Sequence, residues 1–276
     1  MAVFETSIPV VIRNTFFIPF FWIFFVIGVH SPIRLQLIRS LNSGAISSIP
    51  TFELAIIYNE IEVIRKNAFR NLSRLELLYL DHNNIASVES YAFENLPSVK
   101  GIYLRNNNID VIKKDTFVNL PNLENIYINN NKLKKFDQNW FLPTPKLRRL
   151  VLHDNQITSL QRAAFQDFRF LITIDFTNNK LRYIHPEVFY GLQLEDLSLG
   201  GNELTSFDEV KLSYSSAFYR LEIERNKFTY LSPRFFNEVF NVIDNNSIIF
   251  PDAVPAVRDT EGIVYTRKSI AMCVCR

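Results

Sequence analysis

The sequence is short of the residues on which disulfide frameworks, metal sites and phosphate-binding loops depend. It has two cysteines, Cys273 and Cys275, and seven glycines among 276 residues. One glycine pair, Gly200-Gly201, is not followed by a lysine at a helix start, as a phosphate-binding loop requires. Thirty basic and 28 acidic residues give a net charge of +2 and no overall attraction to nucleic acid. We therefore expect no cofactor, no metal and no nucleic-acid partner.

What the sequence has is an asparagine that recurs at a nearly fixed interval. Six of the seven intervals are 24 residues long and one is 23, and the frame L-x-x-L-x-L-x-x-N-x-L surrounds the asparagine. A fixed period of this length predicts a solenoid of stacked turns, because one turn cannot bury its apolar face alone. The asparagines are Asn59, Asn83, Asn107, Asn131, Asn155, Asn179, Asn202 and Asn226.

Eight repeats cover residues 51–241, and positions within a repeat are counted from its first residue. Positions 4 and 6 are apolar and alternate with polar neighbours, which predicts one short strand per repeat and a parallel sheet after stacking. The asparagine at position 9 has an amide donor and an acceptor, so we expect it to bond backbone groups at the following turn. The repeats begin at Thr51, Leu75, Val99, Leu123, Leu147, Leu171, Leu194 and Phe218.

A phenylalanine occupies position 19 of most repeats. Stacked turns place these side chains in one column behind the sheet, where each buries roughly 150–250 Å². We interpret them as a core spine and not as a surface for a membrane or a cofactor. The column comprises Phe69, Phe93, Phe117, Phe141, Phe165, Phe189, Leu212 and Phe236.

Both ends of the chain differ from the repeats. Residues 15–29 are almost wholly apolar, which favours a secretory signal within residues 1–31 over a membrane span, since a span needs about 20 residues. An uncleaved N-terminal anchor in the plasma membrane, or an incorrectly assigned start of the chain, would fit the same stretch. We expect a degenerate cap at residues 32–50 and a C-terminal cap or tail, complete or truncated, at residues 242–276.

Two further features fit an extracellular location. Asn71 and Asn245 each begin a glycosylation sequon, Asn-Leu-Ser and Asn-Asn-Ser. Cys273 and Cys275 are too close in sequence to form an unstrained disulfide with each other, so they are candidates for an intermolecular disulfide.

The 24-residue frame with phenylalanine at position 19 resembles the "typical" subfamily of animal extracellular leucine-rich repeat proteins, which includes Toll-like receptor ectodomains, Slit-like guidance proteins and secreted arthropod repeat proteins. The resemblance covers residues 51–239. It implies an α/β solenoid, a leucine-rich repeat horseshoe with a parallel β-sheet on the concave face and mostly irregular or 3-10 convex loops. Many members carry a four-cysteine cap at each end, whereas this chain has no N-terminal one and only Cys273-Val274-Cys275 near its end.

In that family the concave face usually carries partner binding, so outward strand positions are the candidates. Tyr79, Tyr103 and Tyr127 occupy position 5 of consecutive repeats, and strands lie about 4.8 Å apart, which predicts a row of stacked rings. Tyrosine is a favoured interface residue, although it also favours strands and shields the leucines beneath it. A polar rim beside the row is expected from Arg105, Asn129, His153 and Asp154.

Other chemistry has less support. His82 and His153 are three repeats apart, about 14 Å at the strand spacing, so one metal ion cannot bind both. No serine or histidine lies in a loop that would assemble a nucleophile with its base, so we expect no catalytic residue and no enzyme. Gly200 and Gly201 replace two outward side chains and predict a shallow dip. An edge for an anionic glycan is offered by Arg65, Lys66, Lys113, Lys114, Lys132, Lys134 and Lys135.

Together these features favour a secreted or cell-surface, receptor-like recognition module that binds a protein partner through its concave face. The main alternative is a non-catalytic scaffold or inhibitor subunit of an enzyme complex, since crustacean luciferase complexes contain a similar repeat subunit. An extracellular-matrix structural protein is a third interpretation. Contact with a membrane is expected only if the N-terminal apolar segment is retained.

Overall fold

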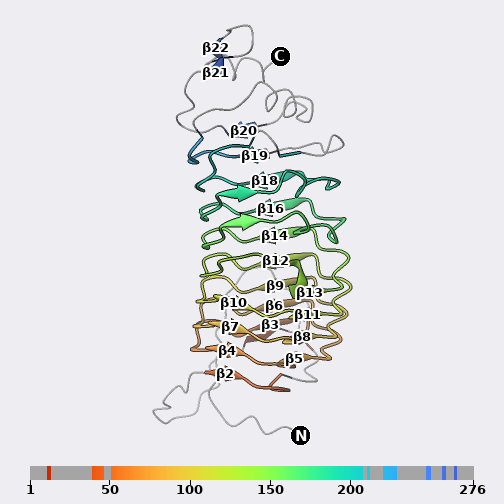
Figure 1. Cartoon of the computed structure of the whole chain (residues 1–276). Helices are drawn as coiled ribbons and strands as arrows, with labels where there is room; N and C mark the ends of the chain where they lie inside the picture. The colour runs from red at the N-terminus through yellow and green to blue at the C-terminus, as the bar shows by residue number, and fades with distance from the viewer. Residues whose placement is uncertain are drawn as a thin grey trace, which may run out of the picture. The chain divides into compact units, whose positions relative to one another are not determined.

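A computed structural model describes residues 39–46, 51–207, 210–211 and 220–228, together with the backbone of four short strands outside these ranges. The chain divides into two compact units. The N-terminal unit is Met1–Leu123 with Asn139–Thr144, and the C-terminal unit is Glu124–Gln138 with Pro145–Arg276. Within each unit, short strands stack one above another, one for each turn of the chain (Figure 1).

Each unit contains a column of three-residue strands at positions 3–5 of the repeats. They pair in parallel, and the middle residue of every strand from β3 to β19 in this column is buried. The first and third side chains therefore point to the opposite face. The N-terminal column is β3 (Glu53–Ala55), β6 (Leu77–Tyr79) and β9 (Gly101–Tyr103), with β1 (Val11–Arg13) antiparallel to β3. The C-terminal column is β12 (Asn125–Tyr127), β14 (Arg149–Val151), β16 (Thr173–Asp175), β18 (Asp196–Ser198) and β19 (Arg220–Glu222), and β20 (Ser247–Ile249), beyond the eight repeats, pairs in parallel with β19.

The 23-residue repeat keeps this alignment. Thr173 of β16 pairs with Asp196 of β18, 23 positions later, whereas Arg149 of β14 pairs with Thr173, 24 positions later. The missing residue is thus absorbed after the strand, and the buried residues Ile174 and Leu197 still face each other.

Further columns of two-residue parallel strands follow the first one around each turn. The second column holds β2 (Ser40–Leu41), β4 (Val63–Ile64), β7 (Ser87–Val88) and β10 (Val111–Ile112) in the N-terminal unit, and β15 (Ser159–Leu160) and β17 (Tyr183–Ile184) in the C-terminal unit. The third, in the N-terminal unit, holds β5 (Phe69–Arg70), β8 (Phe93–Glu94), β11 (Phe117–Val118) and β13 (Phe141–Leu142). The chain also forms a 3-10 turn, η1 (Gln138–Trp140), and an antiparallel pair of β21 (Val257–Arg258) and β22 (Val264–Tyr265).

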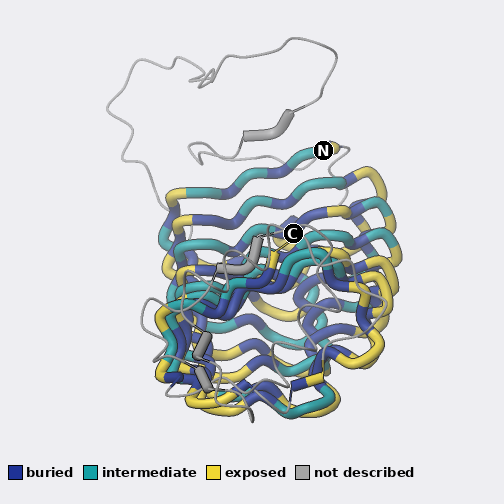
Figure 2. Tube along the Cα trace, turned by 90° about the horizontal axis from the view of Figure 1, so that it is seen from above, coloured by how far each residue is buried: buried dark blue, intermediate teal, exposed yellow. Residues whose placement is uncertain are grey.

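The parallel solenoid agrees with the predicted fold class, and its outer side is more regular than predicted. In the N-terminal unit the outer segments form the β5–β13 column instead of irregular or 3-10 loops. Equal repeat lengths cause this order: the N–H of Phe69 reaches the carbonyl of Ala92 at 3.0 Å, and the N–H of Phe93 reaches that of Thr116 at 3.1 Å. Exposed residues gather where the chain turns, and buried residues lie along the segments between (Figure 2).

The predicted phenylalanine spine is present in both units. In the C-terminal unit the ring of Phe165 stacks on that of Phe189, with centroids 5.9 Å apart. The column thereby fills the space behind the sheet without polar atoms. Leu212 and Phe236 lie outside the described residues. In the N-terminal unit successive centroids are 5.3, 5.1 and 5.0 Å apart for Phe69, Phe93, Phe117 and Phe141.

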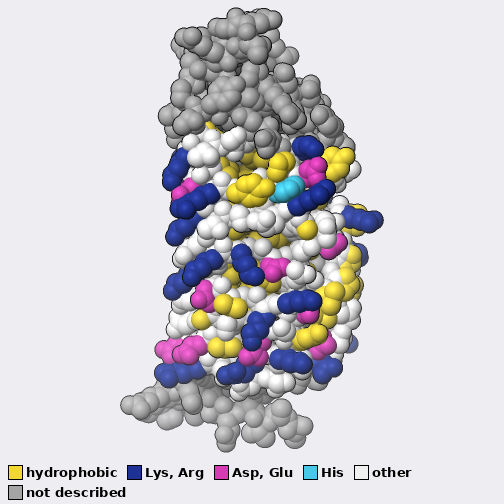
Figure 3. Space-filling view, in the orientation of Figure 1, with side chains coloured by type: hydrophobic (Ala, Val, Ile, Leu, Met, Phe, Trp, Pro, Cys, Tyr) yellow, Lys and Arg dark blue, Asp and Glu magenta, His cyan; other side chains and the backbone are white. Residues whose placement is uncertain are grey.

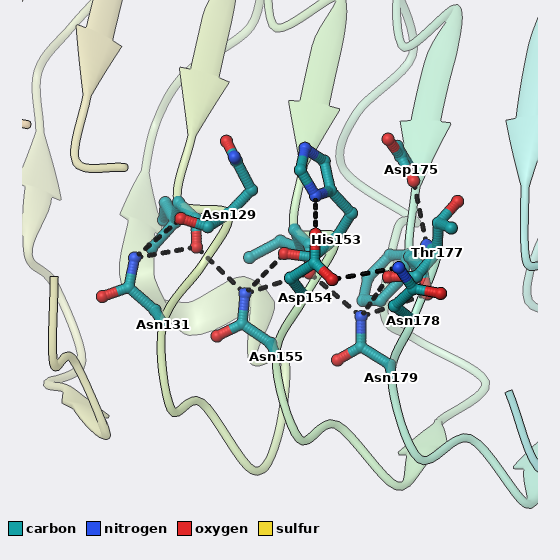
Figure 4. A network of polar contacts seen from close by, with 12 residues as sticks. Asn129, Asn131, His153, Asp154, Asn155, Asp175, Thr177, Asn178 and Asn179 are labelled. Carbon is teal, nitrogen blue, oxygen red and sulfur yellow. Dashed lines mark hydrogen bonds and ion pairs between the residues drawn. The ribbon is translucent and has the colours of Figure 1, made fainter. Parts of the chain in front are cut away.

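The asparagine at position 9 joins consecutive turns through its side-chain amide. Asn155 Nδ2 donates to the carbonyl oxygen of Leu152 in its own turn and to that of Ile128 in the previous turn, both at 3.0 Å. Its Oδ1 accepts the backbone N–H of Leu133 at 3.0 Å. Figure 4 shows three of these amides in a row. The same bonds recur at Asn83, Asn107, Asn179, Asn202 and Asn226.

These bonds confirm the predicted role of the asparagine. Asn155 is 6% exposed, so the backbone groups that it contacts have no access to water. A buried N–H or C=O without a partner costs about 1–3 kcal/mol, and a leucine at position 9 would leave several of them unpaired.

The residue before each of these asparagines has a positive φ, in the left-handed region. The chain turns sharply at this residue, because the strand has ended and the next segment runs in another direction. Asparagine, aspartate and glycine tolerate this conformation best, but Tyr58 and His82 also adopt it, each with φ of 55°. Their rings stack with centroids 4.6 Å apart. The other left-handed residues at position 8 are Asn106, Asn130, Asp154, Asn178, Gly201 and Arg225.

Salt bridges also connect neighbouring turns, and opposite charges adjoin each other on the face shown in Figure 3. Glu187 lies 2.8 Å from Arg162 Nη2 and 3.0 Å from Lys211 Nζ, which belong to the turns on either side. The hydrogen bond from Lys211 and the charges of Arg162 and Lys211 lower the pKa of the Glu187 carboxyl. Because these groups are exposed, each pair adds little to the free energy of unfolding.

The repeat that contains η1 departs from the others at two core positions. Position 18 is alanine or threonine in the three preceding repeats, as at Ala92, but here it holds Trp140, which is 1% exposed. Position 22 is leucine in the preceding repeats but here it is Thr144, which is 4% exposed and whose Oγ1 has no hydrogen-bond partner. Thr116, at 0% exposure, donates instead to the carbonyl oxygen of Lys113 at 2.6 Å.

Replacing Asn155 by alanine is expected to lower the free energy of unfolding by about 2–5 kcal/mol, because the Leu133 N–H and the Ile128 carbonyl lose their shared partner. Urea unfolding followed by far-ultraviolet circular dichroism measures the change. The exposed Thr158→Ala is the control, with an expected effect within about 0.5 kcal/mol. Equal midpoints for the two variants would contradict the role of the amide.

Thr144→Val is expected to stabilise the N-terminal unit by about 1 kcal/mol, because it removes a buried hydroxyl without a partner and keeps the side-chain volume. Thr116→Val is expected to destabilise the same unit by about 1 kcal/mol, because its hydroxyl is bonded. Thermal unfolding of both variants provides the comparison. A loss of stability in both would show that the Thr144 hydroxyl is satisfied.

Candidate partner-binding face

Side chains at positions 3, 5 and 7 leave the first strand column on its solvent side, and we call this surface the sheet face. In the N-terminal unit, Tyr79 and Tyr103 are paired in register and their rings stack with centroids 4.6 Å apart and planes 17° apart. Gly101 makes room for the second ring, since a Cβ there would lie 2.9 Å from Tyr103 Cε2 and 3.1 Å from its Oη. The predicted stacking of Tyr79 and Tyr103 is confirmed.

Arg105 is fixed beside these rings by Asp81 of the previous turn. Asp81 Oδ2 accepts Nη2 of Arg105 at 2.7 Å, and Oδ1 accepts its Nε at 3.2 Å and its backbone N–H at 2.7 Å. The guanidinium lies 5.1 Å from the centroid of the Tyr103 ring. The Arg105 side chain remains 38% exposed while that of Asp81 is 7% exposed. A forked charge-assisted bond of this kind orders the arginine in advance of any partner.

Sequence reasoning selected Tyr103 and Arg105 but missed the two residues that position them, Gly101 and Asp81. The available signal was the 24-residue spacing between Asp81 and Arg105, which places opposite charges at position 7 of neighbouring repeats. The absence of a side chain at position 3, two residues before a tyrosine at position 5, was the signal for Gly101.

The remaining predicted residues belong to the C-terminal unit. Tyr127 is half-buried on β12, in register with Val151 and Asp175 on the next two strands. Its place in one row with Tyr79 and Tyr103 stays a prediction. Asn129, two residues further on, is 5% exposed, and its Oδ1 has no hydrogen-bond partner. A buried amide oxygen without a partner lowers the stability of the fold by about 1–3 kcal/mol.

His153 and Asp154 form a fixed pair in the same unit. His153 Nδ1 lies 2.6 Å from Asp154 Oδ2, and Asp154 Oδ1 accepts Asn178 Nδ2 at 3.0 Å (Figure 4). Their side chains are 30% and 39% exposed. The other predicted histidine, His82, stacks on Tyr58. Among the described residues, no three or more His, Cys, Asp or Glu side chains are grouped so as to hold a metal ion.

The prediction of a dip at Gly200 and Gly201 is wrong, because side chains from the neighbouring turns fill the space beside the two glycines. A Cβ on Gly200 would lie 2.3 Å from Glu224 Oε1, and one on Gly201 would lie 2.3 Å from Asn178 Oδ1. The side chains of Glu224 and Asn178 therefore occupy the space beside the two glycines, and no hollow remains.

The basic residues that suggested an edge for an anionic glycan fall into two groups. Arg65 pairs with Glu89 at 3.4 Å, Lys66 lies 5.1 Å from the centroid of the Tyr91 ring, and Lys135 pairs with Asp137 at 3.4 Å. The exposed residues that form no such contact with the described part of the chain are Lys113, Lys114, Lys132 and Lys134.

Several predictions fall on residues that the structure does not describe: the apolar run 15–29, Asn245, Cys273 and Cys275. Asn71 is described, and it lies exposed directly after β5 with φ of 59°. Within the described ranges, no helix is long and apolar enough to cross a membrane.

Two family models match the chain over the stacked turns. A BspA type leucine rich repeat region matches residues 39–172 in six copies, and a second leucine rich repeat model matches residues 145–204. The chain is a leucine-rich repeat protein. A search of curated proteins finds none that matches.

Solved leucine-rich repeat structures are similar to the chain. TLR13 in its complex with ssRNA13 is 25% identical, with a TM-score of 0.61 over 69% of this chain and 27% of that one. The structure of the Drosophila Toll–Spatzle complex is 18% identical, with a TM-score of 0.68 over 82% of this chain and 35% of that one. A chain in the octameric complex of Latrophilin 3, Unc5D and FLRT2 is 20% identical to this one, with a TM-score of 0.64. The match covers 76% of this chain and 62% of that chain. This chain thus spans about a quarter to a third of the first two, and the two likenesses at 18% and 20% identity show the fold alone.

Proposed function

We propose that this leucine-rich repeat protein is a secreted or cell-surface recognition module that binds a protein partner through its sheet face. The observation that carries the proposal is the cluster of Tyr79, Tyr103, Arg105 and Asp81, in which two stacked rings adjoin an arginine held by a buried carboxylate. Tyrosine and arginine are the residue types that most often contribute binding energy in protein interfaces.

The order of this cluster favours binding over a purely structural role. Tyr103 is confined between Tyr79 and the backbone of Gly101, and Arg105 is held at both its backbone and its guanidinium. A partner would therefore lose little side-chain entropy in contacting these groups, and little backbone change is needed. The rings offer an apolar contact surface, and the guanidinium beside them can donate hydrogen bonds that fix the orientation of a partner.

The similar structures support a protein as the partner class. The Toll–Spatzle complex and the Latrophilin 3, Unc5D and FLRT2 complex are assemblies of proteins. The TLR13 complex contains single-stranded RNA, so RNA is a second ligand class among similar chains. The aromatic and arginine cluster, together with 28 acidic residues against 30 basic ones, favours a protein here. Membership of the animal extracellular subfamily is part of the same proposal.

Tyr103→Ala is expected to weaken partner binding by about thirtyfold or more, because it removes a central ring of the cluster and about 2 kcal/mol of contact energy. Immobilised full-length chain is exposed to an animal-cell secretome, and retained proteins are quantified by mass spectrometry. Tyr91→Ala, which alters a tyrosine at position 17 of the same unit, is the matched control. A partner retained by wild type and Tyr91→Ala but lost with Tyr103→Ala supports the proposal, whereas identical retention by all three contradicts it.

Secretion is tested separately by expressing the full chain in animal cells. We expect an N-terminus near residues 29–32 in the medium, a disulfide-linked dimer before reduction, and a glycan mass that decreases in Asn71→Gln because Asn71 is exposed. Intact mass and N-terminal sequencing give these results. Retention in the membrane with the N-terminus intact would support the anchored alternative, and a chain that stays inside the cell would contradict the extracellular assignment.

A further inference from the structure

In the C-terminal unit, basic side chains form two columns on the turns that follow the sheet. Lys132 and Lys180 occupy position 10, and Lys134 and Arg182 occupy position 12, of repeats two turns apart. All four are exposed, because positions 9 and 11 are buried and direct positions 10 and 12 to solvent. We call these four residues the lysine ridge. The ridge is separate from the sheet face, which positions 3, 5 and 7 form.

Backbone hydrogen bonds hold the three turns of the ridge in register. The N–H of Gln156 donates to the Leu133 carbonyl at 2.8 Å, and the N–H of Lys180 donates to the Ile157 carbonyl at 2.9 Å. The N–H of Arg182 donates to the Thr158 carbonyl at 2.9 Å. With neighbouring strands about 4.8 Å apart, the two cations of each column are attached to the backbone roughly 10 Å apart.

The ridge differs from the rest of the described surface in its charge balance. Most salt bridges in the structure join neighbouring turns, yet Lys132, Lys134 and Lys180 form no ion pair with any described residue. The turn between the two basic turns, residues 155–163, has no Asp or Glu and carries Gln156 and Thr158 at positions 10 and 12. Arg182 pairs with Glu203 at 3.1 Å and marks the edge of the ridge.

We propose that the lysine ridge binds a sulfated polysaccharide. Lysine presents a compact charge on a flexible stem, which suits sulfate groups whose positions vary along a polymer. Clusters of Lys and Arg attract polyanions of this kind, and the two columns let one linear chain contact successive turns. Gln156 and Thr158 add neutral hydrogen-bonding groups between the charges.

A single-stranded nucleic acid fits the ridge less well. Surfaces that bind such strands combine basic grooves with several aromatic side chains, on which successive bases stack. In the second strand column of this unit, Tyr183 is a large exposed ring beside the ridge, at 48% exposure, while the corresponding residue one turn earlier is Ser159. The ridge therefore offers charges at regular spacing and one ring.

The structure revises which basic residues matter. Arg65, Lys66 and Lys135 are engaged with Glu89, Tyr91 and Asp137, and so are less available to a ligand. Lys180 and Arg182 join the ridge although they are 48 residues from Lys132 and Lys134, because stacking brings every second repeat close.

The test is chromatography of the full-length chain on immobilised heparin, compared with a variant carrying Lys132→Gln, Lys134→Gln and Lys180→Gln. We expect wild type to be retained at physiological salt and the variant to elute at clearly lower salt. The slope of log affinity against log salt concentration should fall in magnitude by about 2, at roughly 0.7 for each lost contact. The control carries Lys113→Gln, Lys114→Gln and Lys146→Gln, which remove the same charge elsewhere, and should elute with wild type.

Three outcomes would overturn the proposal. Wild type could fail to bind heparin at physiological salt, or the control could elute as early as the ridge variant, which would show attraction by net charge only. The ridge could also bind polyuridine RNA or phosphatidylserine vesicles as tightly as heparin, with the same loss in the ridge variant, which would assign it to another ligand class. Circular dichroism spectra that match wild type confirm that the variants are folded.

Discussion

In six of the described turns, one short side chain bonds backbone groups in two turns at once, and the rest of the structure depends on these bonds. The position-9 amide donates to carbonyls of its own and the previous turn and accepts an N–H of the previous turn, as Asn155 does with Leu152, Ile128 and Leu133. Hydrophobic stacking alone would bring turns together without fixing their height or rotation. The amide fixes both, and the parallel register of the strands, the spacing of the phenylalanine rings and the alignment of the outward side chains at positions 3, 5 and 7 follow from it.

That fixed geometry explains why the most useful functional features are pairs between turns. Tyr79 meets Tyr103, Asp81 meets Arg105, and Asp154 meets Asn178, each 24 residues apart. None of these contacts needs a loop of special shape, because each results from two residues that share a position in consecutive repeats. The side chains of such a surface share a position in consecutive repeats and so lie in columns. The surface is rigid because the asparagine hydrogen bonds hold the underlying turns in place.

The period and the alternation of apolar residues were enough to predict the first strand column, the bonding of the position-9 asparagines to backbone groups, the spine and the Tyr79–Tyr103 stack, since all of them depend only on residue type and spacing. The β5–β13 column could not be predicted in this way, because its bonds depend on how closely Phe69 and Phe93 stack. The prediction of a surface dip at Gly200 was wrong because the side chain of Glu224, one turn later, is long enough to fill the space beside the glycine. The arrangement of Lys132 and Lys180 was missed because a linear reading treats distant lysines as unrelated.

The single repeat of 23 residues shows where the architecture permits variation in length. Its strand and its asparagine bonds remain aligned with those of the next turn, at Thr173 and Asp196 and at Leu181 and Asn202, so the shorter path lies in the outer part of the turn. Insertions and deletions should therefore accumulate between position 12 and the end of a repeat, while the first eleven positions keep a constant length. Lineages of such proteins can change their outer surface freely, and can gain or lose whole turns, without altering the recognition geometry of the sheet.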